Sequence, residues 1–269
     1  MLKLAWEAYI VNIEHLGGIV LVRLKEVHKN FKGKKGIIKA VDGVSFEAAP
    51  GEIFGLLGPN GAGKTTTLRL ISTLLKPNSG EITVFGFDTV KNAREVRERI
   101  GFLTSDMKLA GNLSPRELMY FFGDLNHIDR KTVGKRIDTL ANYLDMNDFL
   151  DERISKLSTG MKQKASIAVS IIHDPQVIVF DEPTNGLDII TARTVTEIIK
   201  DFKEQGKTVI ISTHVMSVAE KLCDRVGIIL KGKLVEIDYL KSLYSEYGSE
   251  DLEDIFFAIA EKEGGLVDA

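Results

Sequence analysis

The stretch GPNGAGKT (Gly58–Thr65) combines the residue types that bind phosphate groups. Its glycines let backbone N–H groups curve round an anion, and Lys64 places a cation beside the terminal phosphates. The Thr65 hydroxyl is placed to ligate Mg²⁺. An apolar run precedes the stretch and a helical pattern follows it, as a phosphate-binding loop requires. We expect the nucleotide to contact Gly58, Pro59, Asn60, Gly61, Ala62, Gly63, Lys64, Thr65 and Thr66.

Two further apolar runs end in side chains that could act on such a nucleotide. VIVFDE (Val177–Glu182) ends in two carboxylates, which a buried strand can carry only at its open end. Open parallel sheets bind ligands at the carboxyl ends of their strands. We therefore expect Asp181 in the Mg²⁺ shell and Glu182 as the base for an attacking water. His214 closes the next run, and a neutral imidazole there could orient that water or contact the γ-phosphate.

A second, weaker anion site opens the segment LSTGMKQKASIAVSIIHD (Leu157–Asp174). Ser158 or Thr159 is a candidate N-cap, and the apolar periodicity that follows predicts a helix. Gly160 stands beside the bare N–H groups of the helix start, a position that favours an anion. Since a better phosphate site already exists at Gly58–Thr65, the residues alone leave open which anion this weaker site would hold.

The elements that must position these residues alternate along the chain, which predicts an α/β domain with a parallel sheet. Strands are expected at 20–27, 44–48, 52–57, 81–85, 177–180, 208–212, 226–230 and 234–237. Helices are expected at 64–73, 93–99, 115–125, 131–144, 161–173, 191–205 and 216–222. Residues from about 106 to 153 give only helical signals, so they predict a helical subdomain inserted into the sheet domain. Residues 1–19 form an N-terminal extension, and 238–269 a helical tail.

The composition limits the classes of function. The 35 Lys and Arg residues against 38 Asp and Glu residues give a net charge of −3, which argues against a nucleic-acid-binding surface. The single cysteine, Cys223, excludes an internal disulfide framework. No run reaches the ~18 apolar residues that a membrane span needs. Work at a membrane would therefore require a separate chain that supplies the span.

GPNGAGKT, LSTGM, VIVFDEPTNGLD and STH, in that order, resemble the motifs of the ATP-binding subunit of an ABC transporter. The resemblance covers about Leu21 to Ile237. It implies an ATPase that uses ATP and Mg²⁺, with a P-loop NTPase core, an N-terminal antiparallel β subdomain and the inserted helical subdomain, together spanning 20–237. NGLD (Asn185–Asp188) stands where the family joins its two ATP sites.

In that family two subunits dimerise head to tail. The resemblance therefore implies that Ser158 and Gly160 hold the γ-phosphate of ATP bound to a second, identical subunit. It also implies a transmembrane permease on a separate chain and no nucleic-acid partner. The subunit is then expected to be cytoplasmic and peripheral, held at the inner face of the cell membrane by the permease.

Phe31 stands where the family stacks an aromatic ring on adenine. Two departures from the family pattern concern the motifs themselves: Thr159 replaces the first signature glycine, and Met161 replaces the terminal glutamine. Ser105 stands where the family has a glutamine that contacts Mg²⁺ or the lytic water, and either Ser105 or Asp106 could ligate the metal. The pattern is similar to exporters for sodium extrusion or drug efflux.

Two other classes compete with a transporter subunit. ABC-type ATPases that act on ribosomes or DNA usually carry two cassettes in one chain or a long coiled-coil insertion, and neither is present here. A P-loop kinase would have no reason for LSTGM or for a histidine after a third strand. We therefore expect an ATPase that drives export through a separate membrane subunit.

Overall fold

A six-stranded, mostly parallel sheet forms the centre of the computed structural model, which describes residues 20–34, 36–104 and 107–264. Its order is β10-β9-β3-β8-β7-β6, and only β10 runs antiparallel to its neighbour. The strands are β3 (Ile53–Leu57), β6 (Ile100–Leu103), β7 (Val177–Asp181), β8 (Thr208–Thr213), β9 (Arg225–Leu230) and β10 (Lys233–Tyr239). Strands β3, β7 and β8 are buried along their whole length, as their continuous apolar runs predict.

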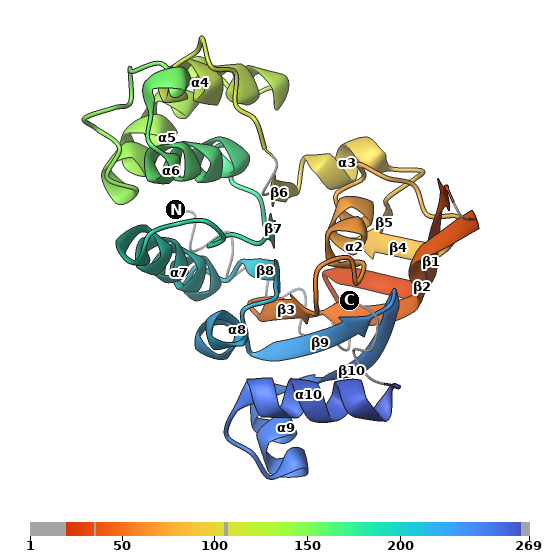
Figure 1. The fold of residues 1–269 in the computed structure, drawn as a ribbon. Helices are drawn as coiled ribbons and strands as arrows, with labels where there is room; N and C mark the ends of the chain where they lie inside the picture. The colour runs from red at the N-terminus through yellow and green to blue at the C-terminus, as the bar shows by residue number, and fades with distance from the viewer. Residues whose placement is uncertain (1–19, 35, 105–106, 265–269) are drawn as a thin grey trace, which may run out of the picture.

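A second, antiparallel sheet has the order β2-β1-β4-β5 and packs beside the first (Figure 1). Its strands are β1 (Val22–Gly33), β2 (Gly36–Ala48), β4 (Ser79–Val84) and β5 (Phe87–Asp88). The helices are α2 (Lys64–Ile71), α3 (Ala93–Arg97), α4 (Pro115–Leu125), α5 (Arg130–Tyr143), α6 (Thr159–Ile171), α7 (Ile189–Glu204), α8 (Met216–Leu222), α9 (Leu240–Tyr247) and α10 (Leu252–Lys262), with a 3₁₀ turn at Ile154–Lys156. The predicted fold class, an α/β P-loop NTPase core with an antiparallel β part, is confirmed.

The described residues between β6 and β7 form helices and turns and no strand. Helices α4, α5 and α6 lie together at one end of the molecule, whereas α9 and α10 lie at the opposite end beyond β9 and β10 (Figure 1). Ser114 caps α4 with a reciprocal bond to Glu117, and Asp129 caps α5 through the Thr132 amide.

Several strand predictions were wrong. The two-residue β5 was not predicted, and β2 begins at Gly36 instead of at residue 44. β6 was not predicted, because it has only four residues between polar flanks and is too short for a periodicity argument. β1 continues to Gly33, so Phe31 lies inside a strand rather than after one; it pairs with Ile38 of β2. Much of this long hairpin is exposed, so it contains few buried apolar residues. Without a regular alternation of apolar and polar residues, the sequence did not reveal its full length.

Candidate functional site

The phosphate loop joins β3 to α2 and needs glycine at two positions. Gly58 has φ 154°, and a Cβ there would overlap the Ile229 carbonyl oxygen. Gly63 has φ 112°, and a Cβ there would overlap the Ala40 carbonyl oxygen of β2. Ala62 also accepts a backbone hydrogen bond from the Gly232 amide at 2.9 Å. The loop is therefore held closely between β2 and the β9–β10 turn.

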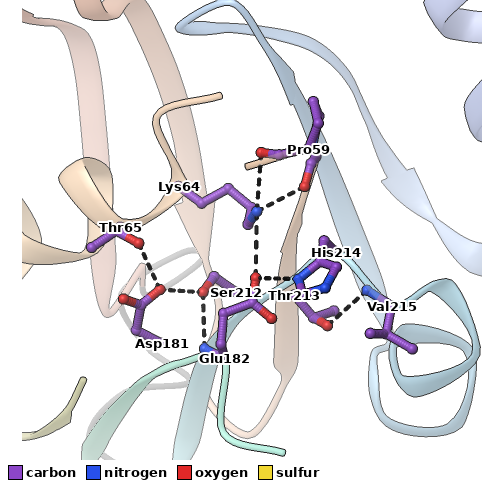
Figure 2. A network of polar contacts seen from close by, with 10 residues as sticks. Pro59, Lys64, Thr65, Asp181, Glu182, Ser212, Thr213, His214 and Val215 are labelled. Carbon is purple, nitrogen blue, oxygen red and sulfur yellow. Dashed lines mark hydrogen bonds and ion pairs between the residues drawn. The ribbon is translucent and has the colours of Figure 1, made fainter. Parts of the chain in front are cut away.

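Lys64, the first residue of α2, is 5% exposed and folds back over its own loop. Its Nζ donates to the carbonyls of Gly58 at 2.7 Å and Pro59 at 3.2 Å, and lies 3.4 Å from Glu182 Oε1 (Figure 2). The ammonium thus has three oxygen partners inside the site. Phosphate oxygens could replace any of them without leaving a buried charge unpaired.

Strand order brings the other predicted residues to this loop. β3, β8 and β7 are neighbours, so Gly58, His214 and Asp181 stand at adjacent strand ends. Thr65 Oγ1 donates to Asp181 Oδ1 at 3.0 Å (Figure 2). Asp181 is 1% exposed, and its Oδ2 has no hydrogen-bond partner among the described residues. A buried carboxylate oxygen beside the phosphate loop without a donor is suited to a cation or a water molecule.

Glu182 and His214 contact each other directly. His214 Nδ1 lies 2.9 Å from Glu182 Oε1, and the Glu182 side chain is 11% exposed. Glu182 has φ 50°, a strained value for a residue with a side chain. Its amide donates to the Ser212 carbonyl and to Ser212 Oγ, both at 3.1 Å (Figure 2). These bonds hold the backbone in the turn that aims the carboxylate at Lys64.

Ser158 and Gly160 do not join this cluster. Ser158 is the N-cap of α6 and accepts from the Met161 amide at 3.3 Å, which decides between Ser158 and Thr159. A Cβ on Gly160 would lie 2.9 Å from Thr191 Oγ1, so the starts of α6 and α7 pack together. Figure 1 shows α6 beside α5 and away from α2. Within the described residues, no contact of Ser158 or Gly160 reaches the phosphate loop of the same chain.

Asp188 ends the NGLD segment and caps α7. Its Oδ1 accepts from the amides of Ile190 and Thr191, each at 3.0 Å. The Thr191 amide and hydroxyl bonds lower the pKa of Asp188, so it stays an ionised cap. A carboxylate at a helix N-terminus also stabilises the helix dipole.

Phe31 lies on the β1–β2 hairpin, where it is 39% exposed and pairs with Ile38. Ala40, two residues further along β2, contacts the phosphate loop at Gly63. The hairpin therefore runs alongside the loop. The predictions for Ser105 and Asp106 lie outside the described residues.

Two polar residues of the site were not predicted. Ser212 Oγ donates to Asp181 Oδ1 at 2.5 Å and also accepts from the Glu182 amide. Gln163 Nε2 on α6 donates to the carbonyl of Pro183, the residue after Glu182, at 2.9 Å. The position of Ser212 within the buried β8 run was a usable signal, because a hydroxyl there needs a partner. Gln163 gave no such signal, because its partner Pro183 lies 20 residues away in sequence and comes close to α6 only when the chain folds.

Comparison with known proteins agrees with this geometry. The family model described as ABC transporter matches residues 41–185. The chain is 42% identical over 239 residues to the ABC transporter ATP-binding protein NatA of Bacillus subtilis (strain 168), covering 88% of this chain and 97% of NatA. It is 38% identical over 223 residues to the bacitracin transport ATP-binding protein BcrA of Bacillus licheniformis, covering 81% of this chain and 72% of BcrA.

Solved structures share the fold of this chain. The ATP-binding subunit of an ABC transporter superposes with a TM-score of 0.81 at 24% identity, covering 89% of this chain and 99% of that one. A dimeric post-hydrolysis state of the ATP-binding cassette MJ0796 with ADP and Pi superposes with a TM-score of 0.74 at 28% identity, covering 81% and 98%. The chain therefore belongs to the ABC transporter family, and it is an ATP-binding, ATP-hydrolysing subunit of such a transporter.

Proposed function

We propose that this subunit hydrolyses MgATP in a head-to-tail dimer and powers export through a separate membrane permease. The observation that carries the proposal is the continuous polar network from Thr65 through Asp181 and Ser212 to Glu182, and from Glu182 to Lys64 and His214 (Figure 2). It joins a phosphate-binding cation, a candidate metal ligand and a candidate base at one sheet edge.

Each residue of the network has a role in this proposal. Lys64 binds the terminal phosphates of ATP, and the N–H groups of the phosphate loop surround them. Glu182 accepts a proton from the attacking water, and His214 fixes the orientation of that carboxylate through their shared hydrogen bond. Phe31 stacks on the adenine ring. Ser158 and Gly160 bind the γ-phosphate of the partner's ATP.

The donor set fits Mg²⁺. Thr65 Oγ1 and the unpartnered Asp181 Oδ2 are oxygen ligands, which this ion prefers. The part of the chain that the structure describes has no cluster of three or more His, Cys, Asp or Glu residues arranged to hold a metal. Mg²⁺ usually takes only one or two protein oxygens and completes its shell with phosphates and water. The ion would neutralise charge that develops on the phosphates.

The membrane partner has a candidate docking place whose lining shares no residue with the ATP network. A hollow of about 400 Å³ lies between α3, β6, α4 and α6. Leu74 and Leu125, each 58% exposed, line it together with the cations Arg94 and Arg97. Among the described residues, no helix is long and apolar enough to cross a bilayer. We propose that a segment of the permease occupies this hollow and holds the subunit at the inner face of the membrane.

Direction of transport rests on the relatives. BcrA is named for bacitracin transport, and LnrL of Bacillus subtilis (strain 168), 36% identical over 224 residues, for linearmycin resistance. Resistance by transport requires movement outward, which supports export by the present chain.

The test is Glu182→Gln, which keeps the size of the side chain and removes the base. ATP binding should persist, and turnover should fall by ~10²–10⁴-fold, the usual share of a general base. Calorimetry measures the binding and phosphate release measures the turnover. If turnover survives in Glu182→Gln and disappears in His214→Ala, the imidazole is the base and the assignment is reversed.

A further inference from the structure

Two adjacent isoleucines project into solvent at the start of α7. Ile189 is 89% exposed and Ile190 is 80% exposed. They follow the N-cap Asp188, whose bonds to the Ile190 and Thr191 amides fix the helix start. Single exposed apolar residues are ordinary, but two neighbours on a rigid, capped helix start form a small apolar protrusion.

The protrusion lies next to the signature segment, LSTGM (Leu157–Met161). Thr191, the next residue of α7, packs against Gly160, so the starts of α6 and α7 form one surface. Gln163 of α6 also donates to the carbonyl of Pro183, in the segment that joins β7 to α7. Whatever faces Ser158 and Gly160 in an assembly will also lie near Ile189 and Ile190.

A concave apolar site lies next to the phosphate loop of the same chain. This C-terminal pocket has a volume of about 500 Å³ and is bounded by Asn60 and His214 on one side and by α8 and α10 on the other. Its apolar lining comes from Val215, Met216, Phe256 and Phe257. Val215 is 40% exposed and Phe257 is 46% exposed, so much of that lining is open.

The pocket wall is firmly anchored, although α10 comes from the C-terminal tail. Leu252 and Ile255 of α10 are buried in the main core, and the Leu252 amide donates to Glu220 Oε1 of α8 at 2.9 Å. α10 therefore presents Phe257 from a fixed position.

In the head-to-tail dimer proposed above, two-fold symmetry would bring the protrusion of each subunit to the pocket of the other. In a head-to-tail dimer, the signature segment of one subunit faces the phosphate loop of the other. The surface beside the signature segment of each subunit then meets the surface beside the phosphate loop of the other. Because the dimer is two-fold symmetric, this contact occurs twice. An exposed apolar protrusion thus meets an open apolar pocket, and both lose water on association.

We propose that Ile189 and Ile190 of one subunit occupy the C-terminal pocket of the second copy in the ATP-bound dimer. The helix α10, which contains none of the ATP-binding motifs, then contributes to dimer affinity through Phe257. This inference rests on the head-to-tail dimer proposed above and adds a contact to it.

The experiment uses the full chain with Glu182→Gln, in which ATP should trap a dimer that light scattering detects. Ile189→Ala/Ile190→Ala and Phe257→Ala should each raise the dimer dissociation constant by about tenfold or more, because each contact occurs twice. Combining them should add little to either effect, since both changes remove the same contact. ATP binding by the monomer should stay unchanged in every variant, which also checks that each one folds.

Leu74→Ala/Leu125→Ala is the matched control, because these exposed leucines line the hollow on another face. It should leave the dimer dissociation constant unchanged. If the Glu182→Gln parent dimerises with ATP and either test variant dimerises as tightly, Ile189 and Ile190 do not occupy the C-terminal pocket, while the head-to-tail dimer stands. If the effects of the isoleucine variant and of Phe257→Ala on the dimer dissociation constant multiply when combined, the isoleucines and Phe257 do not touch. That result would also overturn the proposed contact. A parent that stays monomeric with ATP overturns the dimer and this contact together.

Discussion

The side chain of Gln163 on α6 donates a hydrogen bond to the Pro183 carbonyl, at 2.9 Å. Pro183 directly follows Glu182, whose backbone is held at φ 50°. One bond therefore links α6, the helix that Ser158 caps, to the residue directly after the one that we propose as the base. In the proposed dimer, this helix touches the partner's nucleotide while Glu182 acts on the subunit's own.

Gln163→Ala should lower turnover by roughly 2- to 10-fold with ATP affinity unchanged, since a net hydrogen bond contributes about 0.5–1.5 kcal/mol to holding Glu182 in place. Steady-state phosphate release gives kcat and KM separately. Lys162→Ala, at the exposed neighbouring position, is the control. Equal kcat values for the two variants would show that the bond to Pro183 does not position the base.

Lys64→Ala should weaken ATP binding by about one to two orders of magnitude, because charge-assisted contacts contribute ~1.5–3 kcal/mol. Calorimetry of the purified subunit measures the loss. The Lys64 ammonium also holds Gly58 and Pro59, so the thermal midpoint of the empty protein should fall as well. Undiminished ATP affinity would contradict the assignment of the phosphate loop.

Ser158→Arg in the Glu182→Gln background should abolish the ATP-dependent dimer and leave monomer binding intact. The arginine would fill the space between the start of α6 and the γ-phosphate of the partner's ATP, while the subunit's own phosphate loop is untouched. Light scattering reads the dimer and calorimetry the binding. Loss of monomer binding would place Ser158 in the ATP site of its own chain, against the head-to-tail arrangement.

His173 should make stability depend on pH. Burial lowers the pKa of His173, an effect partly opposed by the bond that its Nε2–H donates to Ile100 O at 3.0 Å; Arg136 lowers the pKa further. Below the ordinary histidine pKa of about 6.5, the unfolded chain takes up a proton that the folded chain does not. The free energy of unfolding should therefore decrease as pH falls from that value towards the folded pKa.

His173→Gln keeps a donor for the Ile100 carbonyl and removes the titration. Urea denaturation at pH 7 and pH 5 should show a smaller loss of stability in this variant than in the parent. The nearby Lys207–Asp174 pair, at 2.6 Å, is present in both proteins and cancels in the comparison. An identical loss would show that other groups determine the acid response.

The fold and the meeting of Lys64, Thr65, Asp181 and His214 at one edge of the sheet could be predicted because their signals are local. Asp181 and His214 each end or follow an apolar run, and Lys64 and Thr65 begin the helix that follows another. Parallel strands bring such ends to one edge of the sheet. Ser212 and Gln163 were missed since their partners lie far along the chain, at Asp181 and Pro183. β6 was too short to give a pattern. α10 borders the phosphate loop because it packs on α8. The periodicity of a single helix does not specify which other helix it packs on.

The position of β3 determines when the ATP site can form during synthesis. β3 pairs with β8 and β9 and with no strand nearer to it in sequence among the described residues. At a synthesis rate of about 5–20 residues per second, its partners leave the ribosome on the order of ten seconds or more after it does. Until then the strand that leads into the phosphate loop lacks both of its strand partners, and its unpaired edges are open to aggregation. Nascent chains that stop before β8 should therefore depend on chaperones.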